Sequence, residues 1–104
     1  MSEKKLISNA AGIFLKAAAY IRQYGWQVEG MGTYGQPRCS MGALASAYQQ
    51  QRWDKRLSQL MYQTLYKELH GISLTQFNHQ YKDGEKVAQL YERVAAKLQQ
   101  TQAF

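Results

Sequence analysis

Cys39, Asn78 and His79 are the residue types in this sequence that could together perform covalent chemistry. Cys39 follows Arg38 and stands just before a predicted helix, so the helix dipole and the neighbouring guanidinium would favour its thiolate, the nucleophilic form. A cysteine hydrolase needs such a thiolate, an imidazole base and a group that orients the base. A papain-type site also rests on a sheet, which this chain is not expected to contain. We therefore interpret Cys39 as a small apolar filler and assign no catalytic residue, and an enzyme that uses Cys39 and His79 is kept as an alternative.

Two further kinds of site can be tested against the sequence pattern. Residues 30–35 read Gly-Met-Gly-Thr-Tyr-Gly and match the G-x-G-x-x-G pattern of dinucleotide-binding loops. That pattern requires a strand before it and a helix opening directly from it, whereas here a predicted helix precedes it. Cys39, His70 and His79 do not have the spacing of any usual zinc ligand set. The sequence therefore predicts neither a cofactor nor a metal.

A basic and aromatic face is predicted on the third helix. Its members are Arg52, Lys55, Arg56, Gln59, Gln63 and Lys67, flanked by Tyr62 and Tyr66. Cations and amides at helical spacing can follow a phosphate backbone, and tyrosines can stack on bases. A polar face opposite an apolar stripe is also what any surface helix shows. We take these residues, together with Tyr34, as the predicted binding surface, and nucleic-acid binding by this face as an alternative function.

Apolar residues recur at steps of three and four in several segments, and this spacing predicts helices. The predicted helices cover residues 8–24, 40–51, 53–70, 74–79 and 84–100, and the second and third could be one bent helix. Ser8 or Asn9 is expected to cap the first helix, and Gly25 to close it. Ser73 followed by Gln76 has the pattern of a capping box.

Residues 26–38 interrupt this helical pattern. Gly30, Gly32, Gly35 and Pro37 fall within eight positions, which predicts a long Gly-rich loop or a small hairpin between the first two helices. The core stripe of the helix that follows is predicted to be Met41, Leu44, Ala45 and Tyr48. Residues 1–7 and 101–104 are expected to fray. The chain is thus predicted to be a single all-α domain over residues 1–104, an irregular bundle of four to five short helices.

The composition limits where this domain works. The chain has 104 residues, a net charge of +6 and a single cysteine, and its sequence pI is about 9.6. A lone cysteine cannot form an internal disulfide, which favours the reducing cytoplasm. The N-terminal residues do not resemble a signal peptide, and no apolar run is long enough for membrane insertion.

Short motifs along most of the chain resemble those of a small bacterial family of unknown function. They match "AA..I...GW.QG", then "G...C..GAL", then "WND", over about residues 10–97. The shared positions fall on Gly25, Trp26, Cys39, Gly42, Ala43 and Asn78. Phe77 and His79 depart from the pattern, since the family usually has Trp and Asp there. The resemblance implies a mostly helical cytoplasmic protein, with shared residues that build a common core, and it implies no activity.

These observations predict a non-enzymatic protein-interaction module rather than an enzyme. Eight tyrosines are more than a core of this size needs, and tyrosine is enriched at protein interfaces. The tyrosines expected at the surface are Tyr34, Tyr48, Tyr62, Tyr66 and Tyr81. Another protein is the predicted partner, and nucleic acid is the alternative. A regulatory or phage-related inhibitor that docks on a larger protein fits this description, while the oligomeric state is not predicted.

Overall fold

A computed structural model describes residues 2–49 and 54–102 and shows an all-α protein. Its helices are α1 (Glu3–Tyr24), α2 (Ser40–Tyr48), α3 (Lys55–Glu68), α4 (Leu74–Tyr81) and α5 (Gly84–Gln102). Within the described ranges, an isolated bridge between Trp26 and Arg38 is the only strand-like pairing. The prediction of an irregular helical bundle is therefore confirmed.

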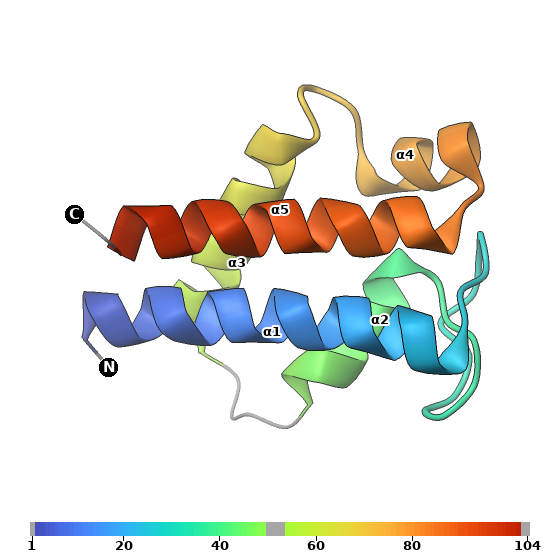
Figure 1. Ribbon diagram of the computed structural model, residues 1–104, viewed down its shortest axis with the longest axis horizontal. Coiled ribbons are helices and arrows are strands. Elements are labelled where there is room, and N and C mark those ends of the chain that lie inside the picture. The colour runs from blue at the N-terminus through green and yellow to red at the C-terminus, as the bar shows by residue number, and fades with distance from the viewer. Residues whose placement is uncertain (1, 50–53, 103–104) are drawn as a thin grey trace.

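The core is built on α1 and α5, which lie antiparallel and side by side, so that both termini are at the same end (Figure 1). Phe14 and Tyr91 meet between them with ring centroids 5.4 Å apart. Ala10, Ala17 and Ala18 are fully buried on α1. Because alanines leave little bulk on a helix surface, these positions let a neighbouring helix approach closely.

The first helix starts earlier than the sequence pattern indicates, and the expected fraying of residues 1–7 is wrong for most of that segment. α1 begins at Glu3, and the side chain of Ser2 caps it by accepting the backbone N–H of Lys5 at 3.2 Å. Leu6 and Ile7 are buried. Ser8, one of the two predicted caps, lies inside the helix and is exposed. Burial of two large apolar side chains holds this turn in place.

The second and third helices are separate elements. α2 ends at Tyr48, three residues before the predicted end, and α3 begins at Lys55. Asp54 has an extended backbone and caps α3, because its carboxylate accepts the N–H of Leu57 at 3.1 Å. Trp53, the predicted start of the third helix, lies outside the described residues. The second and third helices are thus not one bent helix, because an N-cap residue begins α3 as a separate helix.

The remaining helix ends agree with the capping signals. Ser73 and Gln76 form both bonds of the capping box, at 2.9 and 3.0 Å. α4 continues to Tyr81, two residues past the predicted end, and stops where Lys82 adopts a left-handed conformation. The carboxylate of Asp83 then accepts the N–H of Glu85 at 2.9 Å at the start of α5.

The segment between α1 and α2 is a closed loop rather than a hairpin. Its two ends run parallel where Trp26 pairs with Arg38, whereas a hairpin would be antiparallel. The hydroxyl of Tyr20 on α1 holds the tip, since it donates to the carbonyl of Gln36 at 2.7 Å and accepts the N–H of Gly35 at 3.0 Å. The loop is therefore tied to α1 at its middle as well as at its base.

Two sets of ion pairs fasten the outer side of α5. Arg22 of α1 contacts Glu85 and Glu92, each at 2.8 Å. Glu68 of α3 contacts Arg93 at 3.1 Å and Lys97 at 2.7 Å. These cations lower the pKa of each of the three carboxyls below its ordinary value of 4.5, chiefly by hydrogen bonding to the charged form.

Acid should therefore destabilise the fold partly through Glu68, whose side chain is only 7% exposed. A carboxyl with a lowered folded-state pKa stabilises the fold above its unfolded pKa, and this contribution is lost as pH falls through the folded value. Glu68→Gln should consequently lower the urea midpoint at pH 6 and lower it less at pH 3, where a larger share of the wild-type group is protonated. Urea titrations at the two pH values measure this, and an equal loss at both would contradict it.

Candidate functional site

An open groove of about 690 Å³ lies between α2 and α3. It is lined by Met41, Leu44, Ala45, Tyr48, Gln49, Ser58, Met61 and Tyr62. Both helices pack on α1, but their backbones come close to each other at few positions, so a groove remains between them. The volume falls within the range of roughly 300–1,000 Å³ that is common for ligand pockets, and every lining residue is uncharged.

The groove exists because α2 is apolar on two sides. α2 packs against α1, and the small residues of α2 are buried: Gly42, Ala43, Ser46 and Ala47. The predicted core stripe is therefore wrong in part: Leu44 is buried, whereas Met41, Ala45 and Tyr48 are only half-buried and face the groove. Small residues permit the closest helix approach, so their face packs inward and the larger apolar side chains stay outside.

The hydroxyl of Tyr48 joins the end of α2 to the start of α3. It donates to the carbonyl of Asp54 at 3.1 Å and accepts the N–H of Asp54 at 3.0 Å and the hydroxyl of Ser58 at 3.3 Å. The sequence placed Tyr48 both in the core stripe and among the surface tyrosines, and the structure shows it half-buried, lining the groove with its hydroxyl engaged. This junction fixes the distance between α2 and α3, which form the two walls of the groove.

Removing that hydroxyl should loosen the groove. Tyr48→Phe keeps the ring but leaves both backbone groups of Asp54 without this partner, so we expect the free energy of unfolding to fall by about 1–2 kcal/mol. Chemical denaturation measures the change. Tyr81→Phe is the matched control, because Tyr81 is an exposed tyrosine on α4 and should change stability by less than about 0.5 kcal/mol. Equal effects of the two substitutions would contradict the assigned role of Tyr48.

Sulfur atoms are concentrated along this groove and its edge. The hydroxyl of Tyr62 donates to the Sδ of Met41 at 3.6 Å, and Met61 lines the same groove. Met31 of the loop is 48% exposed, and its Sδ lies 4.0 Å from the Sγ of Cys39. Met41 also lines the adjoining pocket that contains Cys39, so the two hollows are neighbours. Methionine is flexible and polarizable, and surfaces rich in it adapt to varied apolar partners.

The structure divides the predicted basic and aromatic face of the third helix between two hollows. Tyr62 lines the α2–α3 groove and stacks on exposed Tyr66, with ring centroids 6.2 Å apart. Arg56, Gln59, Gln63 and Lys67 instead line a second hollow of about 580 Å³, with residues of α1 and α5. Four of the predicted residues therefore share one hollow, whereas Tyr62 lines the other.

The other members of the predicted surface lie apart from this face. Lys55 is exposed one turn before Ser58, on the groove side of α3. Arg52 lies outside the described residues. Tyr34 is 56% exposed, but it packs its ring against Tyr20 and Tyr24 of α1, at 5.6 and 5.9 Å. Tyr34 thus belongs to an aromatic cluster on α1 and not to the α3 surface.

The possible catalytic residues are each engaged in other contacts. Cys39 is the N-cap of α2, and its Sγ accepts the N–H of Gly42 at 3.4 Å. The Nε2 of His79 lies 3.0 Å from Glu29. Asn78 accepts the hydroxyl of Ser40 through its amide oxygen. These contacts do not favour a pair of nucleophile and base, which needs the imidazole beside the thiol.

Ser40 is the centre of a buried polar junction below the groove. The indole N–H of Trp26 donates to its Oγ at 3.0 Å, and its hydroxyl donates to Asn78. The hydroxyl of Tyr91 donates to its carbonyl at 2.6 Å, and burial raises the pKa of that phenol well above its usual value, so the donor proton is retained. One residue thereby connects the loop, α2, α4 and α5. No sequence pattern marked it, because serine at a helix start is common.

Arg38 is turned into the protein and does not add to its surface charge. The residue is 8% exposed, and its guanidinium donates to the hydroxyl of Ser46 at 2.6 Å and to the carbonyl of Gly32 at 3.4 Å. Its Nε has no hydrogen-bond partner among the described residues. The N–H groups of Gly35, Gln36 and Cys39 are bonded within the fold and so are not free to bind a phosphate.

Metal and membrane sites were sought among the described residues. Over residues 2–49 and 54–102, no three histidine, cysteine, aspartate or glutamate side chains are placed to hold a metal ion. No helix in this part of the chain combines the length and apolar character needed to cross a bilayer. The groove between α2 and α3, whose lining includes Met41 and Met61, is the candidate functional site because of its volume and its apolar lining.

Comparison with known proteins gives one assignment. No curated protein and no solved structure matches the chain. The model of a family of unknown function, DUF6197, matches residues 8–97. Trp26, Cys39 and Asn78 are among the positions that carry the resemblance. Cys39 precedes Ser40 in the chain, and Trp26 and Asn78 both bond to Ser40. The chain therefore belongs to DUF6197, a family of unknown function.

Proposed function

We propose that this protein is a non-enzymatic interaction module that docks on a larger protein in the cytoplasm. The observation that carries the proposal is the half-buried apolar face of α2, which forms an open groove with α3. An exposed apolar surface is costly to leave in water, and where it is contiguous it usually marks an interaction site. The single cysteine supports a reducing compartment.

A protein partner accounts for this groove better than nucleic acid does. Its lining contains leucine, methionine and tyrosine, which bury well against apolar side chains, and none of the described residues that line it is a cation. Nucleic acid is bound mainly through cations that contact phosphates. The cations of α3 that line a hollow, Arg56 and Lys67, lie in the second one, which also contains Lys97 and Glu3 and is separate from the apolar groove. We therefore rank nucleic-acid binding below protein binding.

A charge placed in the groove tests the proposal. Ala45→Arg should reduce partner binding at least tenfold, because the guanidinium would be desolvated against an apolar partner. Ala96→Arg on the exposed side of α5 is the matched control and should bind like wild type. Affinity capture from nuclease-treated native cytoplasm, followed by binding measurements with the purified partner, compares the three proteins. Thermal denaturation checks that both variants are folded.

Three results would contradict the proposal. The first is a partner that binds Ala45→Arg and wild type equally. The second is a bound component that disappears after nuclease treatment. The third is a shift of nucleic acid in gel electrophoresis that is strong at low salt and lost at moderate salt, which is the behaviour of a phosphate binder.

A further inference from the structure

We infer that the occupant of the α2–α3 groove is a short amphipathic helix whose apolar anchors are flanked by acidic residues. This inference rests on the proposed function and names the class of partner. It follows from three properties of the groove: its charge environment, its length and the kind of backbone that it can accept.

The chain segment that forms this side of the molecule is almost free of acidic residues. Between residues 30 and 67, Asp54 is the only one, and its carboxylate is used as the cap of α3. Of the described basic residues in this segment, Lys55 is exposed on the groove side of α3, whereas Arg38 is buried and Arg56 and Lys67 line the second hollow. α2 itself has no charged residue. An acidic partner would thus meet attraction here and no matching repulsion.

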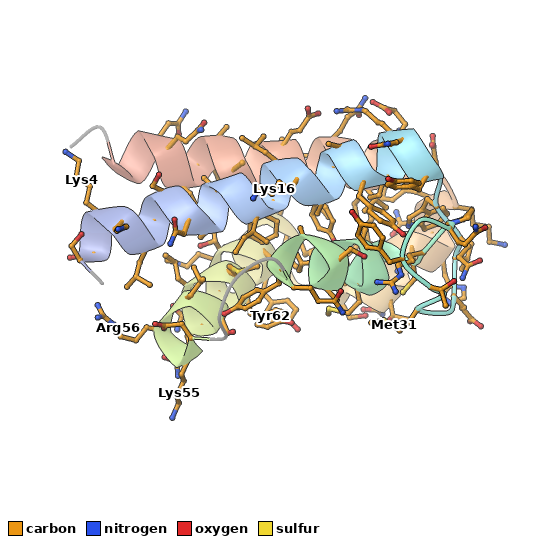
Figure 2. The ribbon with its side chains drawn as sticks, turned by 90° about the horizontal axis from the view of Figure 1, so that it is seen from below. Lys4, Lys16, Met31, Lys55, Arg56 and Tyr62 are labelled. Atoms are coloured by element: carbon orange, nitrogen blue, oxygen red, sulfur yellow. The ribbon has the colours of Figure 1, made fainter. Side chains whose placement is uncertain are left out.

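Lys55 is the cation best placed to contact such a partner. It is exposed and lies on the same face of α3 as Ser58 and Tyr62, which line the groove. Figure 2 shows Lys55 and Arg56 projecting outward at one end of this side of the molecule, Met31 at the other end, and Tyr62 between them. Glu29, near the Met31 end, contacts His79. The positive end of the groove is therefore the start of α3.

The same charges disfavour a second copy of this chain as the occupant. Each copy carries a net charge of +6, so two copies of the chain repel each other as they approach. Like charges that face each other across an interface reduce affinity. A separate partner with acidic side chains avoids this cost.

The length and walls of the groove suit a helix of two to three turns. α2 has nine residues and is therefore about 13 Å long, which equals about two and a half turns of a partner helix. The described residues offer no sheet edge to which an extended strand could add. Apolar residues at positions i, i+4 and i+7 of a helix would lie along the groove, and methionines on both walls would adjust to them.

Selection from a library of random 16-residue peptides displayed on yeast tests the inference. Peptides are selected on the purified full chain and counter-selected on the Ala45→Arg variant. We expect the enriched sequences to have apolar residues at helical spacing and to contain more Asp and Glu than Lys and Arg. A selected peptide should lose affinity roughly three- to tenfold for Lys55→Glu, and it should gain helical circular dichroism on binding. Lys86→Glu on α5 is the matched control and should bind with an affinity close to that of wild type.

Each other result overturns part of the argument. Enrichment of basic peptides, or equal binding to Lys55→Glu and wild type, would show that the partner is not acidic. Enrichment of proline-rich peptides, or binding without a gain in helicity, removes the helix. If no peptide distinguishes wild type from Ala45→Arg while cytoplasmic capture does, this inference fails and the proposed function stands. If capture does not distinguish them either, the proposed function fails.

Discussion

Ser40→Ala is expected to lower the free energy of unfolding by about 2–4 kcal/mol, because it removes the centre of the buried polar junction. The indole N–H of Trp26 would lose its acceptor, and the amide oxygen of Asn78 would lose its donor. A buried polar group left without a partner costs about 1–3 kcal/mol. The bond from Tyr91 goes to the carbonyl of residue 40, so it would remain.

The comparison that isolates this effect is Ser8→Ala. Ser8 is also a serine near the beginning of a helix, but it is exposed, so its replacement should change stability by less than about 0.5 kcal/mol. Alanine is the better helix former at both positions, which makes any loss at Ser40 an underestimate of the value of the junction. Urea denaturation of the three proteins measures the difference. A loss at Ser40 no larger than at Ser8 would show that the junction does not stabilise the fold.

Gly42→Ala is expected to lower the free energy of unfolding by about 1–3 kcal/mol, although alanine favours helices. A Cβ at this position would lie 2.9 Å from the carbonyl oxygen of Met31 and 2.9 Å from the Cβ of Arg38. A backbone carbonyl and the first side-chain carbon cannot move aside without shifting the loop. The close approach of the loop to α2 therefore requires glycine at position 42.

Gly12→Ala is the same chemical change, but we expect it to raise the free energy of unfolding rather than lower it. Gly12 also lies inside a helix, but a Cβ there would meet nothing within 4 Å, so the substitution should stabilise the protein by roughly 0.5–1 kcal/mol. Thermal and chemical denaturation of both variants measure the two signs. Stabilisation by both substitutions would mean that the loop does not constrain α2 as described. Gly42→Ala should also weaken partner binding, because displacement of Met31 alters the edge of the groove.

These two positions link the stability of the fold to the candidate site. Ser40 fixes the first turn of α2 from below, and Gly42 fixes the distance between α2 and the loop that carries Met31. The groove is thus a consequence of how firmly α2 is held against the rest of the protein. Variants that unfold this junction should lose docking, whereas Ala45→Arg should lose docking with the junction intact.

Helix positions and most helix ends were determined by local sequence. The spacing of apolar residues predicts the five helices, because a helix repeats its face every three to four residues whatever it packs against. The capping box of Ser73 and Gln76 depends on bonds within four residues, so it is present in both the pattern and the structure. The early start of α1 was missed, because its first turn is held by distant burial of Leu6 and Ile7 rather than by a strong local signal.

Tertiary structure alone decided which face of α2 is covered and therefore where the candidate site lies. The apolar spacing predicts a core stripe of Met41, Leu44, Ala45 and Tyr48, but α2 is apolar on two sides and its sequence does not say which side meets α1. The smaller side chains packed inward because they allow close helix contact, and the larger ones were left along the groove. Tertiary structure also decided that Arg38 and Ser40 are buried, because their hydrogen-bond partners lie on segments that only folding brings together.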